Sequence, residues 1–169
     1  GREIIGKACV SLDYFLDEYG EDGGCDEGAQ YYRQAGLTLF NAVEVLNYVC
    51  GGIFGEVYRE KKIVNMADYI RRVHVAGPYY VNFADCSPKA GPGRAREYLF
   101  GKRTGNGELM AFAAEDYRQC EDKLDLQEHN LMYRVQAAFA HEEMTEYGKG
   151  RETGTVQEGG RAGDWYFPS

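Results

Sequence analysis

Three carboxylates stand close together in a glycine-rich stretch, at Asp22, Asp26 and Glu27. Carboxylate oxygens bind calcium, although the ligand spacing of an EF-hand is absent here. A carboxylate at the end of this stretch could equally stabilise the start of the next helix. Glycines could instead let the backbone approach a substrate at the mouth of a cleft. The residues leave these three interpretations open, and the helix-start role is the commonest for such a sequence.

A second group with chemical potential is Tyr79-Tyr80-Val81-Asn82, directly after Gly77-Pro78. Tyrosine acts as an acid or base when its proton lies next to a reacting oxygen. Asn82 could donate a hydrogen bond to a carboxylate or hydroxyl. Paired tyrosines more often pack and cap, so the residues by themselves favour a structural role for this group.

The composition restricts the class of partner. The chain has 169 residues, enough for one domain with a core, and a formal net charge of −8. This charge argues against nucleic acid or an anionic membrane, and the apolar runs are too short to span a bilayer. An acidic polysaccharide is not excluded, because a local basic cleft could bind it.

The five cysteines are scattered and form no CxxC pair. They predict no zinc knuckle, and reduced thiols in the cytoplasm are favoured over disulfides in the periplasm or outside the cell. We predict no metal and no cofactor. The first residues lack the layout of a secretory signal and an initiating Met, as expected for an internal piece or a processed chain.

Apolar residues recur mainly at helical spacing, which predicts an all-α chain. Glycine or proline ends most of the predicted helices, which cover residues 5–19, 29–50, 57–75, 95–102, 108–121 and 126–146. Segment 79–85 is predicted to be an ordered loop rather than a strand. We expect a helical domain over 1–147 and a Gly-rich tail over 148–169, whose closing aromatic residues fit the start of another domain's strand.

Two runs in this order resemble the heparinase II/III-like family of polysaccharide lyases. The first is LDYFLDEYGEDGGCDEG at 12–28, continued by AQYYRQAG at 29–36, and the second is PYYVNFAD at 78–85. The resemblance covers roughly the first half of the chain. It implies a partial (α/α) toroid built of helical hairpins, which in the family precedes an antiparallel β-sandwich.

The resemblance also implies cleavage of uronate-containing polysaccharide by β-elimination. In this chemistry the uronate carboxylate is neutralised, a base removes the C5 proton, and an acid protonates the leaving oxygen at C4. Tyrosine commonly supplies the acid, so Tyr79 is the first choice and Tyr80 the alternative. Asp22, Glu27 and Tyr31 are expected to line the substrate cleft, with Asn82 as a further contact.

The chain departs from the family pattern in ways that affect activity. Cys25 stands where the resemblance leads us to expect a histidine. A further catalytic histidine often comes from the β-sandwich domain, which we expect to lie outside this sequence. We therefore expect the chain alone to be a poor lyase or none. The alternatives are a non-catalytic helical module that binds carbohydrate or protein, and a purely structural domain in which Glu27 and Tyr79 lie far apart or buried.

Overall fold

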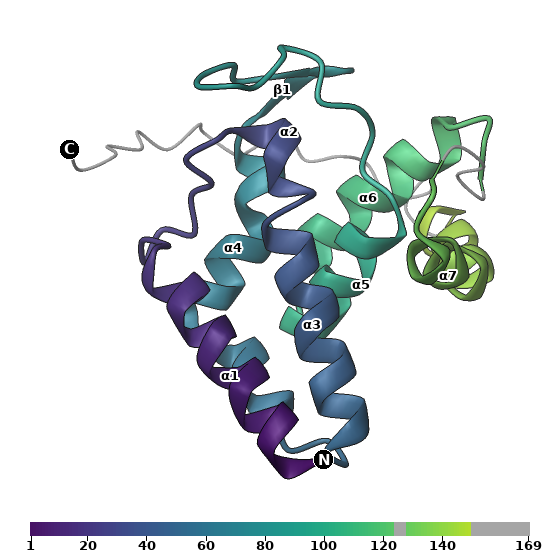
Figure 1. Ribbon diagram of the computed structural model, residues 1–169. Helices are drawn as coiled ribbons and strands as arrows, with labels where there is room; N and C mark the ends of the chain where they lie inside the picture. Colours follow the sequence, from purple (N-terminus) through teal and green to yellow (C-terminus); the bar gives the residue numbers. More distant parts are fainter. Residues whose placement is uncertain (124–127, 150–169) are drawn as a thin grey trace.

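The computed structural model describes residues 1–123 and 128–149, and helices dominate this part of the chain (Figure 1). The predicted all-α class is therefore confirmed. The helices are α1 (Arg2–Asp17), α2 (Ala29–Tyr32), α3 (Gly36–Val49), α4 (Lys61–Arg72), α5 (Ala95–Thr104), α6 (Gly107–Gln119) and α7 (Leu131–Lys149), with a 3₁₀ turn η1 (Gly55–Arg59) before α4. Two short antiparallel strands, β1 (His74–Ala76) and β2 (Tyr79–Tyr80), follow α4. No described helix is both long and apolar enough to cross a membrane.

Helix α5 joins two apolar clusters that form the core. The first cluster lies around α3 and α4 and includes Tyr32, Phe40, Met66, Ile70 and Phe100. The second lies between α5, α6 and α7 and includes Tyr98, Ala113, Tyr117, Ala140 and Met144. Because Tyr98 and Phe100 extend from α5 into different clusters, this helix fixes the α6–α7 pair against the rest of the molecule.

The predicted helix 29–50 is wrong as a single helix. The chain bends between α2 and α3, and the ring of Tyr32 packs over Gly36. A Cβ atom on Gly36 would lie 2.6 Å from Cε2 of Tyr32, so only glycine admits this packing without a shift. The break depends on a tertiary contact, which helical periodicity does not record.

The predicted helix 57–75 is too long at both ends, and the loop predicted at 79–85 begins as a strand. The chain leaves α4 after Arg72 and turns back through Gly77, whose φ is +51°. His74 then pairs with Tyr80, and Val81 N donates to Val73 O at 2.8 Å. The predicted helix 126–146 starts at Leu131 in the described residues. The predicted tail, apart from its first two residues, lies outside them.

Asp68 connects α4 to the start of α6. Its carboxylate is buried and accepts hydrogen bonds from Arg71 Nε at 2.8 Å, Arg72 Nε at 2.7 Å and Asn106 Nδ2 at 2.8 Å. Asn106 is also the N-cap of α6 and accepts from Leu109 N. Burial alone would raise the pKa of Asp68, but these donors outweigh it and hold the pKa below its usual value.

This lowered pKa predicts a pH-dependent contribution to folding. The stability from Asp68 is fully present above its unfolded pKa of about 3.9 and is lost as the pH falls through the lower folded value. Asp68→Asn should therefore destabilise the protein at neutral pH, and the difference from the unmodified chain should shrink below about pH 4. Urea unfolding across pH 2–7 measures this, with the exposed Asp13→Asn as control. A pH-independent difference would contradict the assignment.

Candidate functional site

The acidic loop, residues 18–28 between α1 and α2, is held by side chains of helix α4. Asn65 Nδ2 donates to Glu21 O at 2.6 Å, and Tyr69 OH donates to Cys25 O at 3.2 Å. Gly23, with φ +71°, lies so close to the α4 backbone that a Cβ atom would be 2.7 Å from Met66 Cα. Gly23 therefore permits the close approach of this loop to helix α4, as well as any role toward a ligand.

The carboxylates of this loop point outward. Asp22, Asp26 and Glu27 are exposed, and Asp22 Oδ1 accepts from Gly24 N at 3.1 Å within the loop itself. Among residues 1–123 and 128–149, no three His, Cys, Asp or Glu side chains are grouped in a way that could hold a metal ion. The described geometry thus gives the calcium interpretation no support.

The structure brings the two sequence motifs into contact. Gly28, with φ +86°, packs against the end of the second run. A Cβ atom there would lie 3.1 Å from Phe83 O and 2.5 Å from Cβ of Cys86, the residue that follows the run. Gln30 N donates to Cys86 Sγ at 3.3 Å, and Ser87 N donates to Gln30 Oε1 at 3.1 Å. The loop that follows β2 is therefore fastened to the start of α2, although the two segments are 56 residues apart in sequence.

The predicted site residues on this surface differ in exposure. Tyr31 is 39% exposed and Tyr79 is 48% exposed, with Lys89 Nζ 5.4 Å from the Tyr79 ring centroid. Asn82 uses its side-chain amide inside the loop, donating to Cys86 O at 3.2 Å. We call the exposed residues of the two runs, namely the acidic-loop carboxylates, Tyr31 and Tyr79, the motif face.

Tyr80 lies on the opposite side of the hairpin from Tyr79 and is 3% exposed. Its hydroxyl is near the guanidinium of Arg33 yet has no hydrogen-bond partner of good geometry. Burial raises the pKa of Tyr80 to about 12, against the lowering effect of Arg33. Its ring meets that of His74 at a centroid distance of 5.0 Å. Tyr80 is thus part of the interior in this structure.

Arg33 is the centre of the polar interior beside Tyr80. Its Nε donates to Glu97 Oε1 at 3.0 Å, its Nη2 donates to Gly91 O at 2.9 Å, and its Nη1 donates to Ala90 O. Glu97 is 1% exposed and also accepts from the backbone N–H of Arg94 at 3.0 Å. The pKa of Arg33 is raised: burial lowers it, but the neighbouring Glu97 more than compensates.

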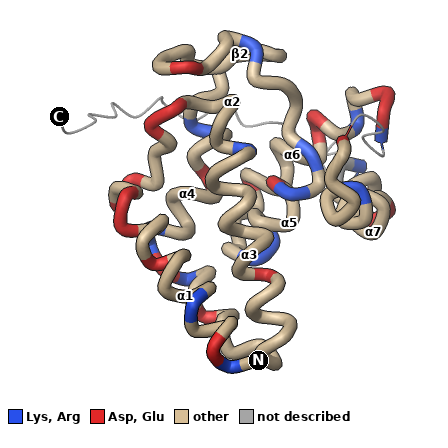
Figure 2. Tube along the Cα trace, in the orientation of Figure 1, with Lys and Arg blue, Asp and Glu red and all other residues tan. Residues whose placement is uncertain are grey.

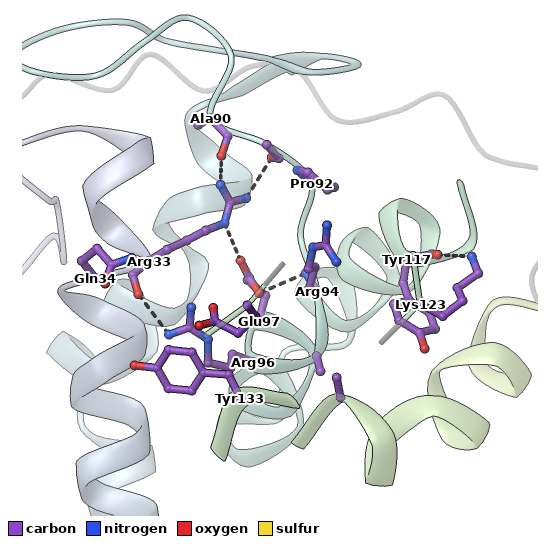
Figure 3. A pocket seen from close by; sticks show the side chains of 14 residues that line it. Arg33, Gln34, Ala90, Pro92, Arg94, Arg96, Glu97, Tyr117, Lys123 and Tyr133 are labelled. Carbon is purple, nitrogen blue, oxygen red and sulfur yellow. Dashed lines mark hydrogen bonds and ion pairs between the residues drawn. The ribbon is translucent and has the colours of Figure 1, made fainter. Parts of the chain in front are cut away.

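Next to this ion pair is a cavity of about 240 Å³ (Figure 3). Its charged lining consists of four cationic side chains and two carboxylates: Arg33, Arg94, Arg96, Lys123, Glu97 and Glu128. Tyr117 and Tyr133 form apolar parts of its wall. Figure 2 shows blue Lys or Arg positions directly after α2 and at the start of α5, and red Asp or Glu positions along the loop from α1 to α2. We call this space the basic cavity.

None of the predicted residues Asp22, Glu27, Tyr31, Tyr79, Tyr80 and Asn82 lines the basic cavity. The sequence analysis includes Arg33 in the first run but gives it no role. One sequence feature could have indicated this cavity. Arg94-Ala95-Arg96-Glu97 follows a Gly/Pro stretch, which places two arginines at the start of a helix.

Searches with family models and among curated proteins find no match to this chain. The function proposed below therefore rests on the residues and their geometry.

Gly23 offers a test of how the acidic loop is held. Gly23 and Gly105 share a φ of +71°, but a Cβ atom on Gly105 would meet nothing within 4 Å. Gly105→Ala should cost about 1–2 kcal/mol from backbone strain alone. Gly23→Ala adds the clash with α4 and should cost about 2–5 kcal/mol. Thermal unfolding compares the two, and equal losses would show that the loop does not press on α4.

The Arg33–Glu97 pair should be strongly coupled. Arg33→Met leaves the buried Glu97 without its cation and should destabilise the fold by about 3–5 kcal/mol. Adding Glu97→Leu should recover part of that loss, since it removes the orphaned charge. The exposed pair Arg59–Glu56 is the matched control, with an expected effect of about 0–1 kcal/mol. Denaturant titration of the full cycle measures the coupling, and additive losses would contradict it.

Proposed function

We propose that this chain is the helical part, a partial (α/α) toroid, of a heparinase II/III-like lyase that cleaves uronate-containing polysaccharide by β-elimination. The observation that carries the proposal is the contact of Gly28, in the first run, with Phe83 O in the second run and with Cys86 directly after it. Two runs that resemble one family, in the family's order, thus contact each other. The proposal includes a β-sandwich domain as a further part of the complete protein, and little or no lyase activity for this chain alone.

The motif face offers a tyrosine for proton transfer in β-elimination. A base takes the C5 proton, its electron pair forms the C4=C5 double bond, and the C4–O bond breaks as an acid protonates the leaving oxygen. Tyr79 is half exposed beside Lys89, whose ammonium can attract a uronate carboxylate. It is therefore our choice for the group that contacts substrate. Tyr80, buried against Arg33, is a positioning residue in this proposal.

The test uses the natural full-length protein with a panel of uronate polymers, and ultraviolet absorbance to detect unsaturated uronate ends. Tyr79→Phe should lower kcat by about 10²-fold or more while KM changes little, because proton transfer to a positioned group contributes about that much. Tyr48→Phe, on the exposed side of α3, is the control and should keep full activity. Absence of unsaturated ends with every polymer would refute the lyase proposal, and undiminished turnover by Tyr79→Phe would refute only the role of Tyr79.

A second candidate function is non-catalytic carbohydrate binding, favoured by the basic cavity. Its cations offer charge to an acidic ligand, and none of the candidate acid or base tyrosines reaches it. Binding of a uronate oligomer by a full-length protein that produces no unsaturated ends would support this candidate over the lyase.

A further inference from the structure

The charges of the basic cavity are only partly neutralised by the residues around it. Glu97 is committed to Arg33 and to the backbone N–H of Arg94. Glu128 accepts from Asn130 N at 2.7 Å. Within the described residues, neither Arg96 nor Lys123 has a carboxylate at ion-pair distance. The chain is acidic overall, so this local excess of cations runs against its formal charge of −8.

Arg96 is held in a form suited to receive an anion. Its guanidinium stacks on Tyr133, with Cζ 3.8 Å from the ring centroid, and Nη1 donates to Arg33 O at 3.0 Å. The other N–H groups of Arg96 have no protein partner in the part of the chain that the structure describes. A planar guanidinium fixed by stacking presents these N–H groups at little entropic cost, which is the geometry that binds two oxygens of one oxyanion.

Lys123 supplies a second fixed cation on the same lining. Its Nζ donates to Tyr117 O and, at 2.7 Å, to Arg118 O, and it lies 5.0 Å from the centroid of the Tyr117 ring. These two carbonyls, at the C-terminal end of α6, accept from two of its three N–H groups and offset its charge only in part. The start of α5 also lines the cavity, and the positive end of a helix dipole adds to the potential there.

We propose that the basic cavity is a binding site for one oxyanion group, a carboxylate or a sulfate ester, carried by a single sugar unit. Its volume of about 240 Å³ is below the roughly 300–1,000 Å³ of pockets for larger ligands, so it accommodates one unit rather than a long segment. Arg96 is the principal anion ligand and Lys123 supplies further charge, while the rings of Tyr133 and Tyr117 hold these two cations in place. The oxyanion chemistry follows from the cavity itself, and the sugar carrier rests on the proposed function. None of the motif-face residues takes part in this site.

Glu128 allows a test of the charge that the site prefers. Its carboxylate lines the same cavity and repels a bound anion. Glu128→Gln should tighten binding about two- to threefold. At a site selective for cations, Glu128→Gln would weaken binding. At a site for neutral sugar, it would leave the affinity unchanged.

The experiment is an NMR titration of the isotope-labelled chain at low salt with sodium glucuronate, sodium sulfate and glucose, each at matched ionic strength. Glucuronate should saturate one site with a dissociation constant on the order of 1 mM, shifting the amides of Arg96 and its neighbours in α5. Glucose should produce no shift. A glucose 6-sulfate titration compares a sulfate ester with the carboxylate on similar rings, and either one binding at this site supports the proposal.

Substitutions distinguish binding at a specific site from nonspecific electrostatic attraction of the anion to the protein. Arg96→Gln should weaken binding about tenfold or more, and Arg96→Lys should also weaken it, because an ammonium lacks the planar fork. Arg59→Gln removes an exposed arginine elsewhere and should leave the affinity unchanged. Equal losses for Arg96→Gln and Arg59→Gln in folded protein, or no saturable glucuronate or sulfate-ester binding, would overturn the proposal. Saturable binding together with a full-length protein that lacks elimination activity would refute the lyase proposal and retain the anion site.

Discussion

The ion pair between Arg33 and Glu97 holds together segments that are otherwise distant in sequence. Arg33 stands at the bend between α2 and α3, Glu97 lies in the first turn of α5, and the same guanidinium binds the carbonyls at 90–91. Glu97 is almost fully buried, and an unpaired charge at that depth would be strongly destabilising. The position of α5, and with it both core clusters, therefore depends on the bend that carries Arg33.

The position of Arg33 also gives the two tyrosines of the hairpin, Tyr79 and Tyr80, different environments. Successive side chains of a strand point to opposite faces, so one tyrosine must face Arg33 and the other solvent. The pairing of His74 with Tyr80 puts Tyr80 inside and leaves Tyr79 on the motif face. A polymer can reach Tyr79 without a change in the fold, whereas Tyr80 would have to leave its contact with the Arg33 interior. The register of a very short strand pair thus determines which of two adjacent tyrosines is exposed and which is buried.

Helical periodicity predicted the fold class and the approximate places of α1, α4, α5 and α6, because α4, α5 and α6 each bury one face and the apolar side of α1 packs, partly buried, against the first core cluster. It failed where a tertiary contact decides the structure, as at the Tyr32–Gly36 packing that separates α2 from α3. Strands of two or three residues are too short to carry an alternating pattern, so β1 and β2 were not predicted. The basic cavity was missed for a related reason. Arg33 and Glu97 are 64 residues apart, and nothing local indicates that they pair.

The separation of charge between the motif face and the basic cavity matters for either proposed function. A carboxylate that accepts a proton and a cation that binds an anionic ligand neutralise each other when they are adjacent, as Arg33 and Glu97 do. The carboxylates of the acidic loop are exposed on one surface, whereas Arg96 and Lys123 are fixed by tyrosine rings and backbone carbonyls in another. Carbonyls accept hydrogen bonds from a cation but offset its charge only in part. A chain that is acidic overall can thus keep a local positive potential, since solvent and ions screen exposed charges beyond about 10 Å.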